Sequence, residues 1–329
     1  MSNRVPFVDL LSAFFVTEII LMHILLISET LTGFAEHFFF VFSFFMPWFY
    51  FKSGLFYNRA KSLKETIKGG GKSLLLPFLF FAAIGFLCDL PFAWIGSDDP
   101  WYKLLASPFY HILRNGAESG NLPLWFLWSL FFVRIAFLLL MKARIAYLIL
   151  VFPLIGFLLD RFGIILPLTL STVFLGTTFY ACGYLYTKYG PATWPVTLLA
   201  AIVWTGIFFG EMSTVNMWIN HVSNGSYLLW VIASIAGLIV VTEAARRMPP
   251  LPAIQRIGQN SLTYYALHWI ILNTVVHLMR LFGIDTAGWG SAALQAVACI
   301  ILLPIGDHLL RTKAPGWILG RTQPNTCRR

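Results

Sequence analysis

Apolar residues form long runs along this chain, and most polar residues fall between the runs. The runs are close to 20 residues long, which is the length an α-helix needs to cross a bilayer. Open sheets are excluded there, because lipid cannot satisfy their unpaired backbone groups. The pattern therefore predicts an all-α, polytopic membrane bundle of about ten transmembrane helices, with the helix count over 145–187 left open. The spans are expected at 7–28, 38–57, 73–95, 123–141, 145–159, 166–187, 193–210, 226–245, 261–282 and 291–310.

Lysine and arginine gather at alternate ends of these predicted helices. Positive charge marks the cytoplasmic ends of membrane helices, so we expect both termini in the cytoplasm, which places 17 of the 23 cations inside. These cations are Arg4, Arg59, Lys61, Lys64, Lys68, Lys72, Lys142, Arg144, Lys188, Arg246, Arg247, Arg256, Arg311, Lys313, Arg321, Arg328 and Arg329. The outer connections are acidic instead, with Glu29, Glu36, Asp98, Asp99, Glu118, Glu211 and Asp285. This distribution orients a membrane protein and argues against nucleic acid as a partner, despite a net charge of +9.

Composition supports one membrane domain over 1–329. Charged residues make up 11% of the chain, whereas a soluble globular domain carries about 25%. No internal repeat or attached soluble domain is visible, and the first helix is interpreted as a retained span rather than a signal peptide. The longest outer connection, 96–122, is either an interfacial segment or a cover over an outer cavity. Cys88, Cys182, Cys299 and Cys327 are widely spaced, so they are interpreted as packing residues, and no bound metal is expected.

The first predicted helix carries the most informative polar residues. His23 lies deep in this apolar stretch, and an ionisable group inside a bilayer is costly enough to be a functional candidate. Ser12 precedes it by eleven residues, close to three helical turns, so both share a face about 16 Å apart along the axis. Glu18 lies about 140° round the helix from His23. The alternative is that Glu18 and His23 are each satisfied by polar partners on neighbouring helices.

Several separated stretches together resemble the acyltransferase-3 family of integral membrane O-acyltransferases. They are Asp9 with His23, then 45–54 (FMPWFYFKSG), 75–78 (LLPF), 124–130 (LWFLWSL) and 257–268 (IGQNSLTYYALH). Each stretch is aromatic-rich membrane sequence, and their shared order and spacing make the likeness specific. The region 145–245 contributes nothing to it.

The resemblance implies a ten-helix enzyme of a bacterial inner membrane that transfers acyl groups other than amino-acyl groups. Its donor would be acetyl-CoA or another acyl-CoA, and its acceptor a glycan or lipid-linked sugar outside the membrane. Membrane lipids are the remaining partners, and no tightly bound cofactor is expected.

Acyl transfer to a hydroxyl needs a base and a means of stabilising the oxyanion. Imidazole titrates near neutral pH, so His23 is the expected general base. Asp9, Glu18 and His268 are further catalytic candidates, although hydrogen bonding within the bundle would equally explain His268. The candidates for substrate binding are Ser12, Lys52, Trp125, Arg134, Asn260, Ser261 and Tyr264.

One position departs from the family pattern. The family usually carries Arg or Lys where this chain has Ser12, and that cation is expected to organise the acyl-donor end of the site. Lys52 and Arg134 are embedded cations that supply the missing charge in one interpretation and extend to the lipid headgroups in the other.

Two other functions compete with the enzyme. A catalytically inactive family member acting as a partner protein would explain Ser12. A transporter or exporter of a sugar-containing molecule is the other alternative, but such proteins often show inverted repeats and broken helices, and no such symmetry is visible in the sequence.

Overall fold

The computed structural model describes residues 5–96, 100–210 and 213–319. Eight charged or cysteine residues discussed above lie outside this part of the chain. They are Arg4, Asp98, Asp99, Glu211, Arg321, Cys327, Arg328 and Arg329.

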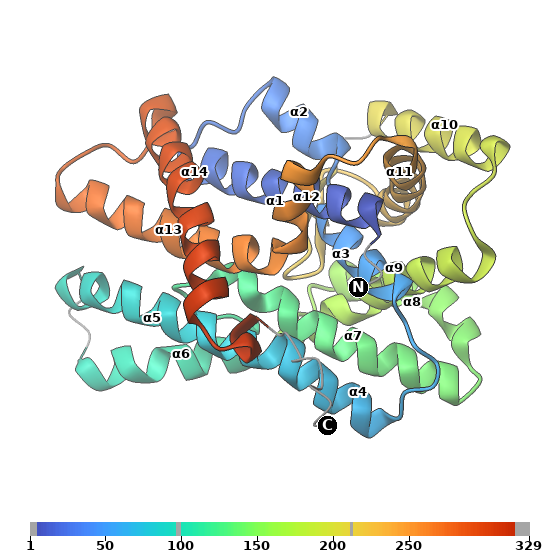
Figure 1. The fold of residues 1–329 in the computed structure, drawn as a ribbon, viewed down its shortest axis with the longest axis horizontal. Helices are drawn as coiled ribbons and strands as arrows, with labels where there is room; N and C mark the ends of the chain where they lie inside the picture. Colours follow the sequence, from blue (N-terminus) through green and yellow to red (C-terminus); the bar gives the residue numbers. More distant parts are fainter. Residues whose placement is uncertain (1–4, 97–99, 211–212, 320–329) are drawn as a thin grey trace, which may run out of the picture. The chain divides into compact units, whose positions relative to one another are not determined.

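The described residues are almost entirely helical, as predicted (Figure 1). The helices are α1 (Pro6–Ile27), α2 (Phe34–Val41), α3 (Phe45–Leu55), α4 (Leu63–Gly70), α5 (Leu76–Gly96), α6 (Trp101–Asn115), α7 (Trp125–Lys142), α8 (Phe152–Arg161), α9 (Leu170–Tyr189), α10 (Trp194–Gly210), α11 (Tyr227–Arg247), α12 (Pro252–Gln259), α13 (Ser261–Leu281) and α14 (Gly288–Lys313). A π-helical turn, Gly71–Leu75, joins α4 to α5, and 3-10 turns occupy Leu122–Leu124, Ala146–Val151, Pro167–Thr169 and Gly316–Leu319. Strands β1 (Thr214–Asn216) and β2 (His221–Ser223) pair antiparallel, with Val215 opposite Val222.

Seven helical stretches among the described residues are long and apolar enough to cross a membrane. They are Pro6–Ile27, Phe34–Leu55, Leu63–Gly96, Leu122–Lys142, Pro167–Tyr189, Tyr227–Arg247 and Gly288–Lys313. Each coincides with a predicted span, so the protein is a multi-pass integral membrane protein. The total number of crossings and the side of each terminus stay predictions.

Three predicted spans differ from these seven. The span predicted at 145–159 is a 3-10 turn followed by the 10-residue helix α8. Pro153 stands in the first turn of α8, where its missing N–H removes no helical hydrogen bond. At 1.5 Å per residue α8 is about 15 Å long, roughly half the hydrocarbon thickness. Helix α10 has 17 residues, and α13 has 21 but carries several polar side chains in its interior.

The segment predicted as the longest outer connection contains α6. Its exposed side chains include Trp101, Tyr102, Phe109 and Tyr110. Aromatic residues on one face of a helix are typical of a segment that lies in a membrane interface, which favours that interpretation of 96–122 over a cover.

Contacts divide the chain into two compact units, and each unit is built from separate stretches of sequence. Unit 1 comprises residues 1–19, 32–61 and 132–261, and unit 2 comprises 20–31, 62–131 and 262–329. Helix α1 begins in unit 1 and ends in unit 2. The prediction of a single domain is not tested by this division and stays a prediction.

Within unit 1, α3 and α9 cross at two glycines. Gly54 of α3 lies against the carbonyl of Tyr180, and Gly183 of α9 lies against the carbonyl of Phe51. Small residues let membrane helices approach this closely, because lipid supplies no hydrophobic drive and packing has to hold the helices together. This contact fixes the part of α3 that carries Lys52 and Ser53.

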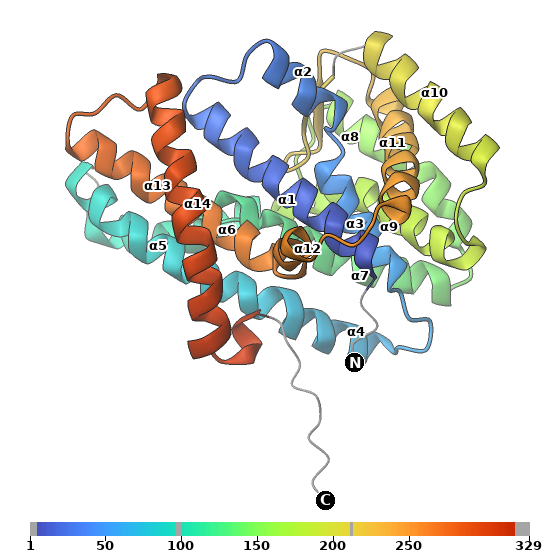
Figure 2. The same ribbon diagram turned by 45° about the horizontal axis from the view of Figure 1, so that its top comes forward.

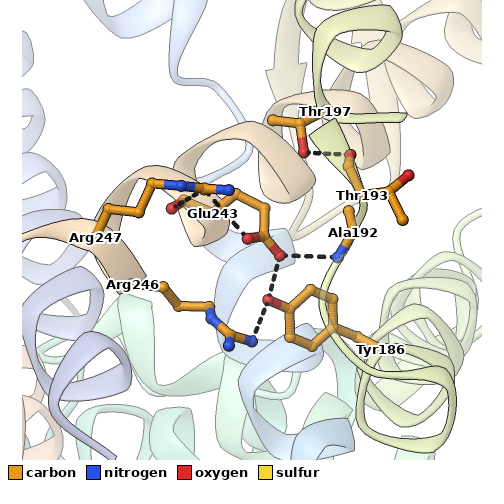
Figure 3. Close-up of polar contacts among 7 residues, drawn as sticks. All are labelled: Tyr186, Ala192, Thr193, Thr197, Glu243, Arg246 and Arg247. Atoms are coloured by element: carbon orange, nitrogen blue, oxygen red, sulfur yellow. Dashed lines mark hydrogen bonds and ion pairs between the residues drawn. The ribbon is translucent and has the colours of Figure 1, made fainter. Parts of the chain in front are cut away.

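A buried carboxylate holds the linker between α9 and α10 to the end of α11 (Figure 3). Glu243 is 2% exposed and accepts hydrogen bonds from the Tyr186 hydroxyl (2.6 Å) and the Ala192 amide (2.9 Å). Arg247 lies 3.3 Å from the other carboxylate oxygen, and Arg246 donates to the Tyr186 hydroxyl at 3.1 Å. The partners offset the cost of removing the charge from water.

The glycine crossing generates a stability prediction. Gly54→Ala places a methyl group where the α9 backbone already lies, so we expect a loss of about 1–3 kcal/mol and a lower Tm in detergent. Gly206→Ala in α10 is the matched control, because nothing lies within 4 Å of the added carbon. The control should melt at or above the wild-type temperature, since alanine is the better helix former by about 1 kcal/mol. Equal shifts in the two variants would contradict the packing described.

Candidate functional site

The predicted site residues divide between the two units. His23, Trp125, Tyr264 and His268 belong to unit 2. Asp9, Ser12, Glu18, Lys52, Arg134, Asn260 and Ser261 belong to unit 1. Each group is described within its own unit.

Two histidines predicted as separate candidates meet in unit 2. His268 Nε2 on α13 lies 3.1 Å from His23 Nδ1 on α1. Their rings are stacked, with centroids 5.1 Å apart and an interplanar angle of 28°. His268 is 0% exposed, whereas His23 is half-buried. His23 is therefore the more accessible member of the pair.

The hydrogen bonds of His268 decide which ring nitrogens carry protons. His268 Nδ1 lies 2.6 Å from the carbonyl oxygen of Tyr265, and a carbonyl only accepts, so Nδ1 carries the proton. Complete burial favours the uncharged ring, which leaves a lone pair on His268 Nε2. That lone pair accepts the proton of His23 Nδ1, and the lone pair of neutral His23 therefore lies on Nε2.

Two hydrogen bonds hold α13 in a position where His268 contacts His23. The Asn121 amide donates to the carbonyl of Ala266 at 2.9 Å, and the Tyr265 hydroxyl donates to the carbonyl of Pro123. Both anchors tie the first half of α13 to the turn that precedes α7. Trp269 packs edge-on against His23, with centroids 5.1 Å apart and an interplanar angle of 80°.

The other two candidates of unit 2 surround this centre less directly. Trp125 is buried and packs edge-on against Phe126, which in turn contacts Tyr265. Tyr264 is half-buried and lies within electrostatic range of Asp307 on α14.

In unit 1, Asp9 near the start of α1 has partners on α12 and α3. Asp9 accepts a hydrogen bond from Gln259 of α12 at 3.1 Å and interacts electrostatically with Lys52. Gly258 lies against the backbone carbonyl of Asp9, which brings α12 onto the first turns of α1. Arg134 donates from Nε and from its terminal nitrogen to the Ser53 hydroxyl, at 3.1 and 3.0 Å.

Asn260 and Ser261 connect α12 to α13. The Asn260 amide donates to the carbonyl of Arg256 at 2.8 Å, and Ser261 is buried at the first position of α13. These residues shape the join between the helices in unit 1.

A comparison with protein families identifies the group. The model of the acyltransferase-3 family, described as an acyltransferase domain, matches residues 5–307. The chain belongs to the acyltransferase-3 family. No curated protein and no solved structure matches it. Membership confirms the resemblance seen in the motifs, and the match also runs through 145–245, which carried none of them. It implies a membrane acyltransferase.

Ser12 is hydrogen-bonded in this family member. Its hydroxyl donates to the carbonyl of Val8 at 2.6 Å and lies 3.4 Å from Nε1 of Trp48. Ser12 and Trp48 are both 0% exposed. The indole therefore packs where a longer side chain at position 12 would begin.

Glu18 is 3% exposed, and neither of its carboxyl oxygens has a hydrogen-bond partner among the residues that the structure describes. The satisfied-by-neighbours interpretation is therefore wrong for the Glu18 oxygens within this part of the chain. His23 does have a polar partner on a neighbouring helix, because its Nδ1 lies within hydrogen-bond distance of His268 Nε2.

The sequence interpretation missed one ionisable pair. Asp89 on α5 and His277 on α13 lie 2.6 Å apart in unit 2. Both residues fall inside predicted spans, at 73–95 and 261–282. An ionisable residue in apolar sequence is a functional candidate, and this argument applies to both residues as it does to His23.

The Ser12 packing generates the second prediction. Ser12→Arg forces a long charged side chain against buried Trp48, so we expect it to cost more than about 3 kcal/mol of stability. Ser12→Ala removes one hydrogen bond and should cost about 1 kcal/mol. Thermal unfolding of the purified protein in detergent measures both. If Ser12→Arg melts at or above the wild-type temperature, position 12 has room for the family's cation and the packing argument is wrong.

Proposed function

We propose that this family member is an O-acyltransferase of a bacterial inner membrane. It moves an acetyl or other acyl group from acyl-CoA to a hydroxyl of an extracytoplasmic glycan or lipid-linked sugar. The observation that supports it best is the His23–His268 pair, in which a buried ring bound to a backbone carbonyl orients a more accessible one. The proposal includes ten crossings with both termini in the cytoplasm.

In this mechanism His23 Nε2 takes the proton of the acceptor hydroxyl as the oxygen attacks the thioester carbonyl. The resulting imidazolium shares its charge with His268 through the Nδ1–Nε2 hydrogen bond. The tetrahedral intermediate then collapses, the carbon–sulfur bond breaks, and His23 returns the proton to the departing thiolate. The products are the acyl ester and the free thiol of CoA.

The oxyanion of the intermediate needs a hydrogen-bond donor. Trp269 is a candidate, because its indole N–H is buried and makes no hydrogen bond with the described residues. Its ring lies edge-on against His23. An indole nitrogen is a donor only, which suits a group that carries developing negative charge.

Unit 1 contains two embedded cations that are candidates for binding the acyl donor. Lys52 interacts with Asp9, and Arg134 with Ser53. Two cations can attract the negative charges of acyl-CoA, and the carboxylate and hydroxyl hold them in place until it binds. Under the proposal, Lys52 and Arg134 serve the role that the family gives to a cation at position 12.

Ser12 also favours a second candidate function, an inactive family member that acts as a partner protein. Such a protein would release no CoA from acyl-CoA under any acceptor condition. No contact among the described residues favours transport of a sugar-containing molecule.

The histidine pair generates the third prediction. His23→Ala should lower acyl transfer by about 10²–10⁴-fold, the usual contribution of a positioned base. His268→Asn should lower it less, because water can still meet His23 Nδ1. CoA release by isolated membranes and base-labile acyl esters on envelope glycan measure the effect, with protein level and insertion unchanged. His37→Gln, at an exposed residue, is the control, and full activity in His23→Ala would remove this assignment.

A further inference from the structure

Helix α4 carries a row of lysines within unit 2. Lys64, Lys68 and Lys72 follow one another at four-residue spacing, and residues four apart lie on the same face of a helix. All three side chains are exposed. None of them forms an ion pair with another described residue. This lysine stripe is therefore a solvent-facing row of positive charge about 12 Å long.

Acidic residues do not neutralise the lysine stripe. Glu65 is the one acidic residue in 62–75, and its carboxylate accepts a hydrogen bond from the Ser62 amide at 2.7 Å in a capping box. The 3-10 turn that follows α14 packs against the π-helical turn and α5. This packing brings a further exposed cation, Lys313, to the same end of unit 2. Positive charge consequently predominates where α4 joins α5.

Exposed apolar side chains adjoin the lysines. Leu63 and Ile67 immediately precede Lys64 and Lys68 in the sequence, and they are 37% and 44% exposed. They also lie four residues apart, so they form an apolar stripe beside the lysine stripe. A helix with a basic face next to an apolar one is suited to the surface of an anionic membrane. Helix α4 has both of these features.

Three glycines join α4 to α5. In the structure α4 continues the line of α5 (Figures 1 and 2), and the helix passes through Gly69, Gly70 and Gly71 into the π-helical turn. An added Cβ at Gly70 would lie 2.8 Å from the Phe131 ring, but nothing lies within 4 Å of one at Gly69 or Gly71. Packing therefore does not explain these two glycines. Each makes the helix easier to break by about fivefold relative to alanine, and π-helical turns often mark functional sites.

We propose that α4 is a hinged segment that binds the headgroups of anionic lipids. Bending at Gly69–Gly71 lays α4 on the bilayer, with the lysine stripe on lipid phosphates and the apolar stripe among the upper acyl chains. A layer of headgroups meets all three lysines of a convex helix at once, whereas a small soluble phosphate ligand is better held in a concavity. Each lysine near an anionic surface favours the bound form by about fivefold, so the three together favour it by about 100-fold.

Hydrogen–deuterium exchange of the purified protein tests the lipid contact. The protein is placed in nanodiscs of neutral phosphatidylcholine, or of an equal mixture of phosphatidylcholine and anionic phosphatidylglycerol. We expect the amides of 63–68 to exchange about tenfold more slowly, or slower still, in the anionic nanodiscs. The amides of 72–75 should exchange faster there, because bending breaks their hydrogen bonds to the preceding turn. Salt at about 1 M, where the Debye length is about 3 Å, should abolish both differences.

Two triple variants test the charge directly. Lys64→Gln, Lys68→Gln and Lys72→Gln combined should exchange alike in the two kinds of nanodisc. The matched control is the combination of Lys64→Arg, Lys68→Arg and Lys72→Arg, which keeps the charge and should retain the wild-type difference. Equal exchange of wild type in both membranes would overturn the inference. Protection of the glutamine variant as strong as that of wild type would overturn it as well.

The hinge is tested by combining Gly69→Ala with Gly71→Ala, at positions where the added methyl groups meet no neighbour. Alanine makes the bend about fivefold less favourable at each position, so most of the protection of 63–68 by anionic lipid should disappear. The amides of 72–75 should then exchange slowly in both membranes. Slower exchange of wild type throughout 63–75 in anionic nanodiscs would contradict a hinge.

A soluble ligand is distinguished from lipid in the same experiment. Acetyl-CoA added to the neutral nanodiscs should leave the exchange of 63–68 unchanged. Protection equal to that given by phosphatidylglycerol would assign the lysine stripe to a soluble phosphate ligand and overturn the inference. No acyl transfer is measured, so the outcome is independent of the proposed function.

Discussion

A polar side chain inside a bilayer has no water to bond with, and most of the candidate chemistry in this protein follows from that constraint. His268 is satisfied on one side by the Tyr265 carbonyl, so its remaining nitrogen is available to a second ring. Because each bond fixes the direction of the next, the backbone carbonyl of one helix determines which nitrogen of His23 holds a lone pair. The tautomer of His23 is thereby set by ordinary helix geometry.

The same constraint explains how the two ionisable pairs of unit 2 differ. The His23–His268 pair contains no carboxylate, so a proton taken up there produces a net positive charge. In the Asp89–His277 pair a carboxylate oxygen lies 2.6 Å from the ring, so the carboxylate can balance the charge of a protonated ring. Two sites with related side chains thus have different chemistry because of their partners.

The sequence predicted the class of fold and seven helices long enough to cross a bilayer, because apolar length alone determines those features. It left the helix count over 145–187 open, and at 145–159 the structure has a 3-10 turn followed by the 10-residue helix α8. His23 and His268 were recognised singly from their position in apolar sequence and in family motifs. Their contact, across 245 positions of sequence, depends on tertiary packing that no local pattern contains. Asp89 and His277 carried the same signal of a polar residue in a span, but no motif drew attention to them.

One helix is much longer than a membrane is thick. Residues Leu63–Gly96 form a single helical stretch of 34 residues through α4, the π-helical turn and α5. At 1.5 Å per residue it measures about 51 Å, against about 30 Å of hydrocarbon. Its first turn is secured by a capping box of Ser62 and Glu65, so the surplus is ordered helix from its start. Unless this helical stretch tilts strongly, about four of its turns must extend into the headgroups or the aqueous phase beyond them.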